Sequence, residues 1–299
     1  MQKLIFGCGY LGRRVALRWI DQGHTVWSLT RTEARALELA QLGIRPIVGD
    51  ICDPDSLRNL PLVQTALFAV AFDRTSNRTR SEVAIGGLSH VLAAIRSKVD
   101  RLIYISSTSV YGQDEGEWVD ELSECNPVQP GGALCLAAEQ LLSSDAAESG
   151  FQRLILRLSG IYGPDRLLSR LASLKAGEVL AGRPDAWLNL IHVEDAVQAV
   201  ISSESIEDPC RTYLVTDDQP IHRDHYFGKL AELVGAPPPR FDPSINPARG
   251  SGGINKRCSN RRMRKELRFD LHYPTIIAGL PQALGQLAMP TRVPEWPVE

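Results

Sequence analysis

The stretch Lys3-Leu-Ile-Phe-Gly-Cys-Gly-Tyr-Leu-Gly12 decides the fold. Its apolar residues 4–6 predict a short buried strand, and the glycines that follow have the spacing G-x-G-x-x-G. A helix is expected over 13–20. A strand, a tight glycine turn and a helix in this order predict a site where the pyrophosphate of a dinucleotide meets the helix N-terminus. A glycine turn without any ligand is the alternative.

The predicted dinucleotide contacts lie in this turn and at the ends of the strands that follow it. They are Gly7, Cys8, Gly9, Tyr10, Leu11, Gly12, Thr30, Arg31, Arg35, Asp50, Ile51, Ala69, Val70, Ala71 and Ser106.

The end of the second predicted strand favours NADP over NAD as the cofactor. An NAD site of this type needs a carboxylate there to accept from the ribose 2′-hydroxyl, and Ser28-Leu-Thr-Arg31 has none. Arg31 and Arg35 would suit a 2′-phosphate, although both also fit a solvated helix face. Asp50 is expected to meet the adenine, with a simple turn carboxylate as the alternative.

Composition excludes several other classes of protein. The chain has 299 residues, of which 43% are hydrophobic and 23% charged, and its net charge is −2. This balance predicts no general binding to nucleic acid or membranes. No apolar run approaches the length of a membrane span, and no signal peptide is expected. The six cysteines form no C-x-x-C pair and no metal-type cluster with histidine, which predicts reduced thiols in a cytoplasmic protein without a metal site.

Strands alternate with helices through the first half of the chain, which predicts an α/β fold with a Rossmann-type, doubly wound parallel sheet. Strands are expected over 4–6, 24–29, 45–48, 65–71, 101–105 and 152–158, and helices over 13–20, 33–42, 80–97 and 133–147. We predict a dinucleotide-binding domain over 1–158 and a smaller C-terminal substrate or lid region over 159–299, of which 192–205 packs back on the first domain. Further helices are expected over 194–202, 223–234 and 275–287, with a short one ending at 267.

Five motifs together resemble those of the extended short-chain dehydrogenases/reductases, the NAD-dependent epimerase/dehydratase family. They are the glycine turn, Asp50, Ile105-Ser-Ser-Thr-Ser-Val-Tyr-Gly112, Arg157-Leu-Ser-Gly-Ile-Tyr-Gly-Pro164 and Ile191-His-Val-Glu-Asp195. The resemblance covers nearly the whole chain. It implies an NAD(P)-binding, oxidoreductase-like protein that acts on a small carbonyl, hydroxyl or nucleotide-linked substrate. It also implies a homodimer formed through helices 80–97 and 133–147.

The family's catalytic pair, a tyrosine followed four residues later by a lysine, is missing. Counting back from Glu139 in the Glu-Gln-Leu-Leu run places Gly131 at the tyrosine position and Cys135 at the lysine position. None of the seven tyrosines has a lysine four residues later. The chain therefore resembles the atypical subgroup, which keeps the cofactor site and has lost the catalytic pair.

Several side chains remain at the expected reaction end. Ser107 matches the family's catalytic serine or threonine, with a loop cap as its alternative. Tyr111 could replace the missing acid, although a structural role is the alternative. The resemblance places four further residues near the substrate: Thr108, Ser159, Tyr162 and His192. His192 could instead be an ordinary half-buried histidine, and Asp195 is expected to be the N-cap of the following helix.

The segment 256–268 holds seven cations and one acid. It is either a solvated helix face or a grip for the phosphates of a nucleotide-linked substrate. Two functions follow from the whole chain. The first is an oxidoreductase of epimerase or reductase type with non-standard acid and base groups. The second is a non-catalytic sensor of NADP(H).

Overall fold

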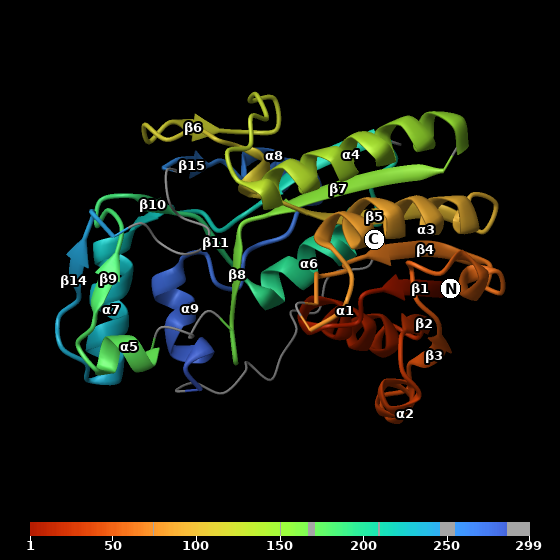
Figure 1. The fold of residues 1–299 in the computed structure, drawn as a ribbon, viewed down its shortest axis with the longest axis horizontal. Helices are drawn as coiled ribbons and strands as arrows, with labels where there is room; N and C mark the ends of the chain where they lie inside the picture. Colours follow the sequence, from red (N-terminus) through yellow and green to blue (C-terminus); the bar gives the residue numbers. More distant parts are fainter. Residues whose placement is uncertain (74, 150, 167–170, 209, 246–254, 286–299) are drawn as a thin grey trace.

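A parallel sheet of seven strands forms the centre of the computed structural model (Figure 1), which describes residues 1–73, 75–149, 151–166, 171–208, 210–245 and 255–285. The strand order is β12-β7-β5-β4-β1-β2-β3, and all pairings are parallel. The strands are β1 (Gln2–Phe6), β2 (Thr25–Thr30), β3 (Arg45–Val48), β4 (Val63–Phe68), β5 (Val99–Ser107), β7 (Gln152–Leu158) and β12 (Cys210–Val215). This arrangement confirms the predicted Rossmann-type fold.

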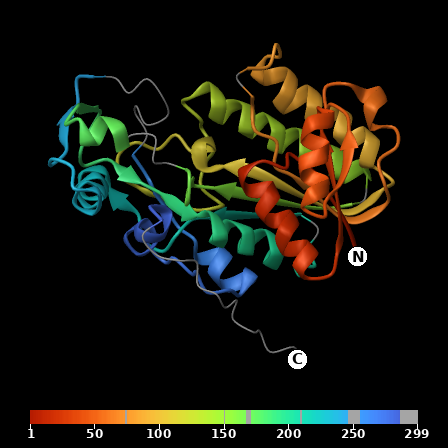
Figure 2. The ribbon, with the colours of Figure 1, turned by 90° about the horizontal axis from the view of Figure 1, so that it is seen from below.

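Helices cover both faces of the sheet (Figure 2). Side chains of one strand alternate between the faces, so that Ile5 joins one buried cluster while Leu4 and Phe6 join the other. The helices beside the sheet are α1 (Tyr10–Asp21), α2 (Glu33–Gln41), the 3-10 turn Pro54–Leu57, the π-helical turn Glu82–Gly87 that continues into α3 (Leu88–Ile95), α4 (Pro130–Ser149) and α6 (Val193–Ser203).

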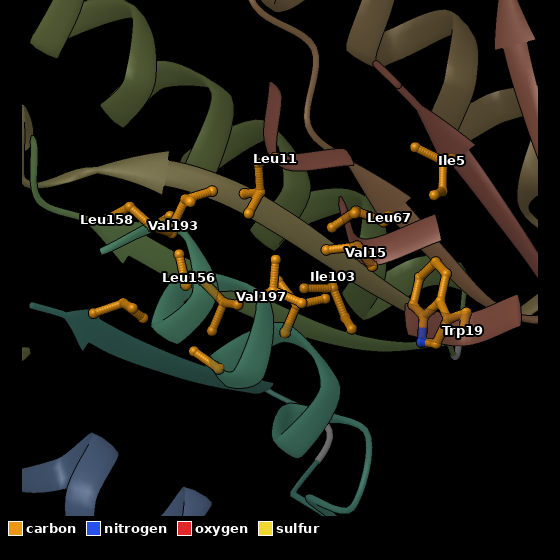
Figure 3. Close-up of a cluster of buried hydrophobic side chains, with 14 of the residues drawn as sticks. Ile5, Leu11, Val15, Trp19, Leu67, Ile103, Leu156, Leu158, Val193 and Val197 are labelled. Carbon is orange, nitrogen blue, oxygen red and sulfur yellow. The ribbon is translucent and has the colours of Figure 1, made fainter. Parts of the chain in front are cut away.

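The cluster beneath α1 and α6 shows why the two halves of the chain hold together (Figure 3). Trp19 of α1 and Val197 of α6 lie over Ile103 and Leu156 of the sheet, and all four side chains are buried. Burying a side chain of this kind contributes roughly 1.5–3 kcal/mol. The packing therefore fixes α6, from the second half of the chain, against the sheet built by the first half.

The structure differs from the sequence-based expectations in two places that matter for the site. The expected strand 65–71 ends at Phe68, and Ala69–Ala71 form a loop at the carboxyl edge of the sheet. Strand β12 was not expected, and the division at residue 158 assigned it to the second region. Its pairing with β7 places it in the main sheet.

A smaller lobe lies beside the carboxyl edge of the sheet, at the left of Figure 1. Its elements pack around a separate buried cluster that includes Tyr226, Leu230 and Leu280. They are α5 (Leu171–Lys175), β9 (Val179–Ala181), β10 (Trp187–Leu188), β13 (Ile221–His222), α7 (Arg223–Val234), β14 (Arg240–Asp242) and α9 (Ile276–Ala283).

Several short elements lie outside the main sheet and the core of the lobe. They are the 3-10 turn Thr108–Val110, β6 (Trp118–Val119), β8 (Gly160–Tyr162), β11 (Leu190–His192), β15 (Arg257–Cys258) and α8 (Arg261–Leu267). None of the helices in the described ranges is both long and apolar enough to span a membrane.

Candidate functional site

The glycine turn between β1 and α1 has the geometry that an anion site requires. Gly7 has φ +94°, and a Cβ there would lie 2.5 Å from the backbone of Ala69. A Cβ on Gly12 would lie 2.3 Å from the carbonyl oxygen of Gly7. By contrast, a Cβ on Gly9, which precedes the first turn of α1, would meet nothing within 4 Å. The turn is thus closed on the protein side and open in front of the helix N-terminus, where a phosphate would lie.

A cleft of about 670 Å³ runs along the carboxyl ends of the strands from this turn. That volume lies within the range of small-molecule and cofactor sites. Every predicted dinucleotide contact except Arg35 lines the cleft. Arg35 instead donates from Nη2 to the carbonyl oxygen of Cys8 at 3.1 Å, so it braces the glycine turn from behind.

An ion pair lies at the end of the cleft formed by β2 and β3. The Nη2 atom of Arg31 lies 2.6 Å from Oδ2 of Asp73, and both side chains are about half exposed. Hydrogen bonds from Arg31 and then Thr75 lower the pKa of Asp73 to about 2. Asp73, Ser76 and Arg78 all line the cleft and were missed from the sequence. They belong to a polar loop that follows β4, and only its position after a strand end could have indicated them.

Three serines at the other end of the cleft differ in their hydrogen bonds. Ser106 Oγ donates to Glu139 Oε1 at 2.5 Å, and Ser107 Oγ accepts from the Ser109 N–H at 3.1 Å. The hydroxyl of Ser159 is buried and has no hydrogen-bond partner among the described residues. All three serines line the cleft. The catalytic role expected for Ser107 and the substrate contact expected for Ser159 remain predictions.

A buried ion pair lies under these serines. The guanidinium of Arg157, on β7, donates from Nε to Glu139 Oε1 at 3.0 Å and from Nη2 to Oε2 at 2.6 Å. Both residues are less than 10% exposed. Glu139 belongs to the Glu-Gln-Leu-Leu run of α4, and no local pattern in the sequence indicates that it pairs with a residue eighteen positions later.

Tyr111 belongs to the same network and does not line the cleft. Its side chain is fully buried, and its hydroxyl accepts from Arg157 Nη1 at 2.6 Å and donates to the carbonyl oxygen of Asp120 at 2.8 Å. Burial raises the pKa of Tyr111 well above its ordinary value. Thr108, which precedes it in the 3-10 turn, also lies outside the cleft lining. The catalytic role expected for Tyr111 remains a prediction, and its contacts are those of a structural residue.

Gly131 and Cys135, the two positions at which the sequence predicts that the family's catalytic pair is missing, lie in the first two turns of α4. The thiol of Cys135 hydrogen-bonds with Ser109, and burial raises the pKa of the thiol. A Cβ on Gly131 would have only one neighbour within 4 Å among the described residues, Nη1 of Arg80 at 3.9 Å. A cation two residues before the π-helical turn therefore borders Gly131, the position expected for the family's tyrosine.

Tyr162 and His192 lie at the junction with the smaller lobe, outside the cleft lining. The ring of His192 is fully buried, and its Nε2 lies 2.8 Å from Gln282 Oε1. Its Nδ1 accepts from the Glu194 N–H, so His192 is the N-cap of α6. The expectation that Asp195 is the cap was wrong. Asp195 accepts from the backbone N–H groups of the segment 272–273, at 2.7 and 3.0 Å.

Most cations of the basic segment 256–268 already have partners in the protein. Lys256 is buried and donates from Nζ to the carbonyl oxygen of Tyr111 at 2.9 Å. Arg264 lies 3.2 Å from Asp270 and 3.8 Å from Asp218. The phosphate grip expected from this segment remains a prediction.

The sheet, the glycine turn and the cleft together define a nucleotide-binding protein of the Rossmann class. A model of the NAD-dependent epimerase/dehydratase family matches residues 4–203, and the chain belongs to this family. It is 27% identical to Protein YeeZ of Escherichia coli K12 over 285 residues, covering 90% of this chain and 95% of that protein.

Two further comparisons bear on the site. The 3-diazoavenalumate denitrifying reductase of a Streptomyces species is 29% identical over 272 residues, covering 82% of this chain and 85% of that protein. The structure of the UDP-glucose 4-epimerase of Thermus thermophilus in complex with NAD superimposes with a TM-score of 0.79 at 19% identity, covering 96% of this chain and 98% of that one. This second likeness concerns the fold.

Proposed function

We propose that this chain is an NADP(H)-dependent oxidoreductase that acts on a small carbonyl or hydroxyl compound. The observation that carries the proposal is one continuous cleft that runs from Arg31, past the open face of Gly9, to the hydroxyls of Ser107 and Ser159. Family membership and the likeness to a reductase support redox chemistry at the serine end. A second form of the proposal is that the substrate is linked to a nucleotide, as the name of the UDP-glucose epimerase indicates for that protein. The cations of the basic segment 256–268 would suit the phosphates of such a substrate.

The residues present fit a dinucleotide. The open face of Gly9 and the N-terminus of α1 would hold the pyrophosphate, and Asp50 would meet the adenine. Arg31 and Arg78 line the cleft where a 2′-phosphate would lie, and Thr30 at the end of β2 offers no carboxylate. When bound, the nicotinamide supplies or accepts the hydride.

Acid–base assistance would come from groups other than a tyrosine–lysine pair. The Ser107 hydroxyl lines the cleft and retains its own proton for donation, because its oxygen accepts the hydrogen bond from Ser109. The guanidinium of Arg80, beside Gly131 and outside the cleft lining, would stabilise negative charge only on a substrate that extends from the cleft to Gly131. Loss of a general acid typically costs about 10²–10⁴ in rate, so slower turnover is expected than for an enzyme with the pair.

The alternative function is a non-catalytic sensor of NADP(H). Membership of the family and the likeness of the chain to a reductase do not favour this alternative.

The test is titration of the protein with NADPH and with NADH, followed by the fluorescence of the reduced nicotinamide. We expect tighter binding of NADPH, and a loss of about tenfold in its affinity in Arg31→Ala with little change for NADH, because only one ligand carries a 2′-phosphate. A panel of ketones and nucleotide sugars then tests turnover. Absence of binding by either nucleotide would refute the proposal.

We also propose, from the resemblance, that two copies pair through the helices expected over 80–97 and 133–147 and, from the cysteines, that the protein is cytoplasmic. Five cysteines in the described ranges are free thiols, which fits a reducing compartment. Sedimentation at several concentrations tests the dimer, and fractionation of cells tests the location.

A further inference from the structure

Ser159 stands apart from the other polar side chains at the serine end of the cleft. It is 6% exposed, it lines the cleft, and its hydroxyl has no hydrogen-bond partner in the described part of the chain. Ser106 and Ser107, its neighbours across the sheet edge, both have partners within the protein. Buried hydroxyl groups are normally paired, because an unpaired one loses its bonds to water without replacement. A ligand in the cleft would supply the missing partner.

The backbone around Ser159 is held firmly. The Ser159 N–H donates to the carbonyl oxygen of Val215 at 3.0 Å, and the Gly160 N–H donates to the carbonyl oxygen of Asn189 at 3.0 Å. These bonds tie the residue to the end of β12 and to the segment before β11. The position of the hydroxyl is therefore set by the sheet before any ligand arrives, which is the condition for a positioning group.

The strand order indicates which part of a dinucleotide would reach this hydroxyl. Strands β2 and β3 lie at one side of the glycine turn, where Thr30 and Asp50 would contact the adenosine. Strands β5 and β7 lie on the other side of β1, and Ser159 directly follows β7. A dinucleotide whose pyrophosphate lies at Gly9 would thus bring its nicotinamide ring to the ends of β5 and β7. The ring's carboxamide offers both a donor and an acceptor, and the Ser159 hydroxyl has both functions unused.

We propose that Ser159 is a positioning residue that hydrogen-bonds the carboxamide of the nicotinamide and thereby orients the ring in the cleft. This inference rests on the proposed dinucleotide function. Ser159 would then contact the carboxamide of the cofactor, whereas a serine that binds substrate would not.

Calorimetric binding of two nucleotides to Ser159→Ala tests the assignment. NADPH carries the nicotinamide, whereas 2′-phospho-ADP-ribose lacks it. We expect the variant to bind NADPH about tenfold more weakly and 2′-phospho-ADP-ribose as the wild type does. The ligand-free variant should melt at the wild-type temperature or above it, because the substitution removes an unpaired buried polar group.

Ser203→Ala is the matched control. Its hydroxyl is also buried, lies on α6 outside the cleft lining, and donates to the carbonyl oxygen of Val200 at 2.7 Å. This variant should melt at a lower temperature and bind both nucleotides normally. The inference is overturned if Ser159→Ala melts lower as Ser203→Ala does, if it binds both nucleotides equally weakly, or if NADPH binding is unchanged. If the wild type binds neither nucleotide, the proposed function itself fails, and this outcome is distinct from the other three.

Discussion

The two ends of the cleft are built in different ways. At the glycine turn the backbone itself makes the site, and its shape depends on two positions, Gly7 and Gly12, where a Cβ would collide with backbone atoms. At the serine end the site rests on a buried network of side chains from α4, β5 and β7, centred on Glu139 and Arg157. Gly131 and Cys135, which stand at the positions expected for the family's acid–base pair, belong to the same helix α4 as Glu139. The Glu139–Arg157 ion pair is therefore the frame of the serine end, whichever groups supply its acid–base chemistry.

The largest effect is expected when that frame is broken. Glu139→Ala would leave the guanidinium of Arg157 buried without its carboxylate, and removing one partner of a buried pair typically costs about 3–5 kcal/mol. Urea unfolding followed by circular dichroism measures the loss. In the double variant Glu139→Leu with Arg157→Met, most of the stability should return, because neither buried charge remains. If the single and double variants are equally unstable, the loss of stability does not come from an unpaired buried charge.

The glycine turn should respond in two separable ways. Gly7→Ala forces a side chain into a backbone with φ +94° and into contact with Ala69, so it should lower the free energy of unfolding by about 3 kcal/mol. Gly9→Ala has free space around it and should leave stability unchanged while weakening nucleotide binding, because the new methyl group fills the place of the pyrophosphate. Thermal unfolding and NADPH titration of both variants separate the effects. Normal binding by Gly9→Ala would show that no phosphate approaches that residue.

The same contrast explains how much could be predicted from the sequence. The sheet, most helices and the glycine turn follow from local patterns of apolar residues and glycines, and they were predicted. Strand β12 was missed because its pairing with β7 is a contact between distant segments. The Glu139–Arg157 pair and the ion pair between Arg31 and Asp73 are also contacts between distant positions, which no local pattern indicates.

His192 offers a test of whether the junction with the small lobe is structural. Burial lowers the pKa of His192 to about 4 and raises the pKa of Asp195 to about 6. Below pH 6.5, the ordinary pKa of histidine, the folded protein progressively loses the stability that the neutral His192 ring contributes. Asp195 acts in the opposite direction, because its protonated form favours the folded state and that contribution disappears as the pH rises through about 6. Between about pH 7 and pH 5 the two contributions offset only in part, with roughly 2 kcal/mol lost and roughly 1 kcal/mol gained, so that a small net loss remains.

His192→Asn removes only the first contribution, and asparagine can still cap α6. The variant should be less stable than the wild type at pH 7, because the ring packs against Tyr162 and Tyr273. However, its stability should rise on going from pH 7 to pH 5, whereas that of the wild type should fall slightly. Urea unfolding at the two pH values measures both slopes. If the free energy of unfolding changes with pH in the same way in both proteins, His192 titrates as an ordinary histidine. Its expected substrate role would then stay open.

The smallest effect concerns the choice between the two dinucleotides. Because its pKa is about 2, the Asp73 carboxyl is ionised at every working pH, and it holds the guanidinium of Arg31 at 2.6 Å. A 2′-phosphate must compete with this carboxylate for Arg31. Asp73→Asn should therefore bind NADPH a few times more tightly, roughly threefold for an exposed pair, and bind NADH unchanged. Titration at low ionic strength gives the clearest result, since salt screens exposed charges.

Asp55→Asn is the control for Asp73→Asn, because it removes another exposed carboxylate, 2.6 Å from Arg58 and outside the cleft lining. The gain in NADPH affinity should shrink as the pH falls from 8 to 5, because the phosphate takes up a proton with a pKa near about 6 while Asp73 stays ionised in the wild type. Weaker NADPH binding by Asp73→Asn would mean that the carboxylate orients Arg31 toward the phosphate and does not compete with it. In that case the choice between NADPH and NADH near Arg31 would depend on a network of side chains, as the serine end does. Only the glycine turn would then be a part of the cleft that the backbone alone makes.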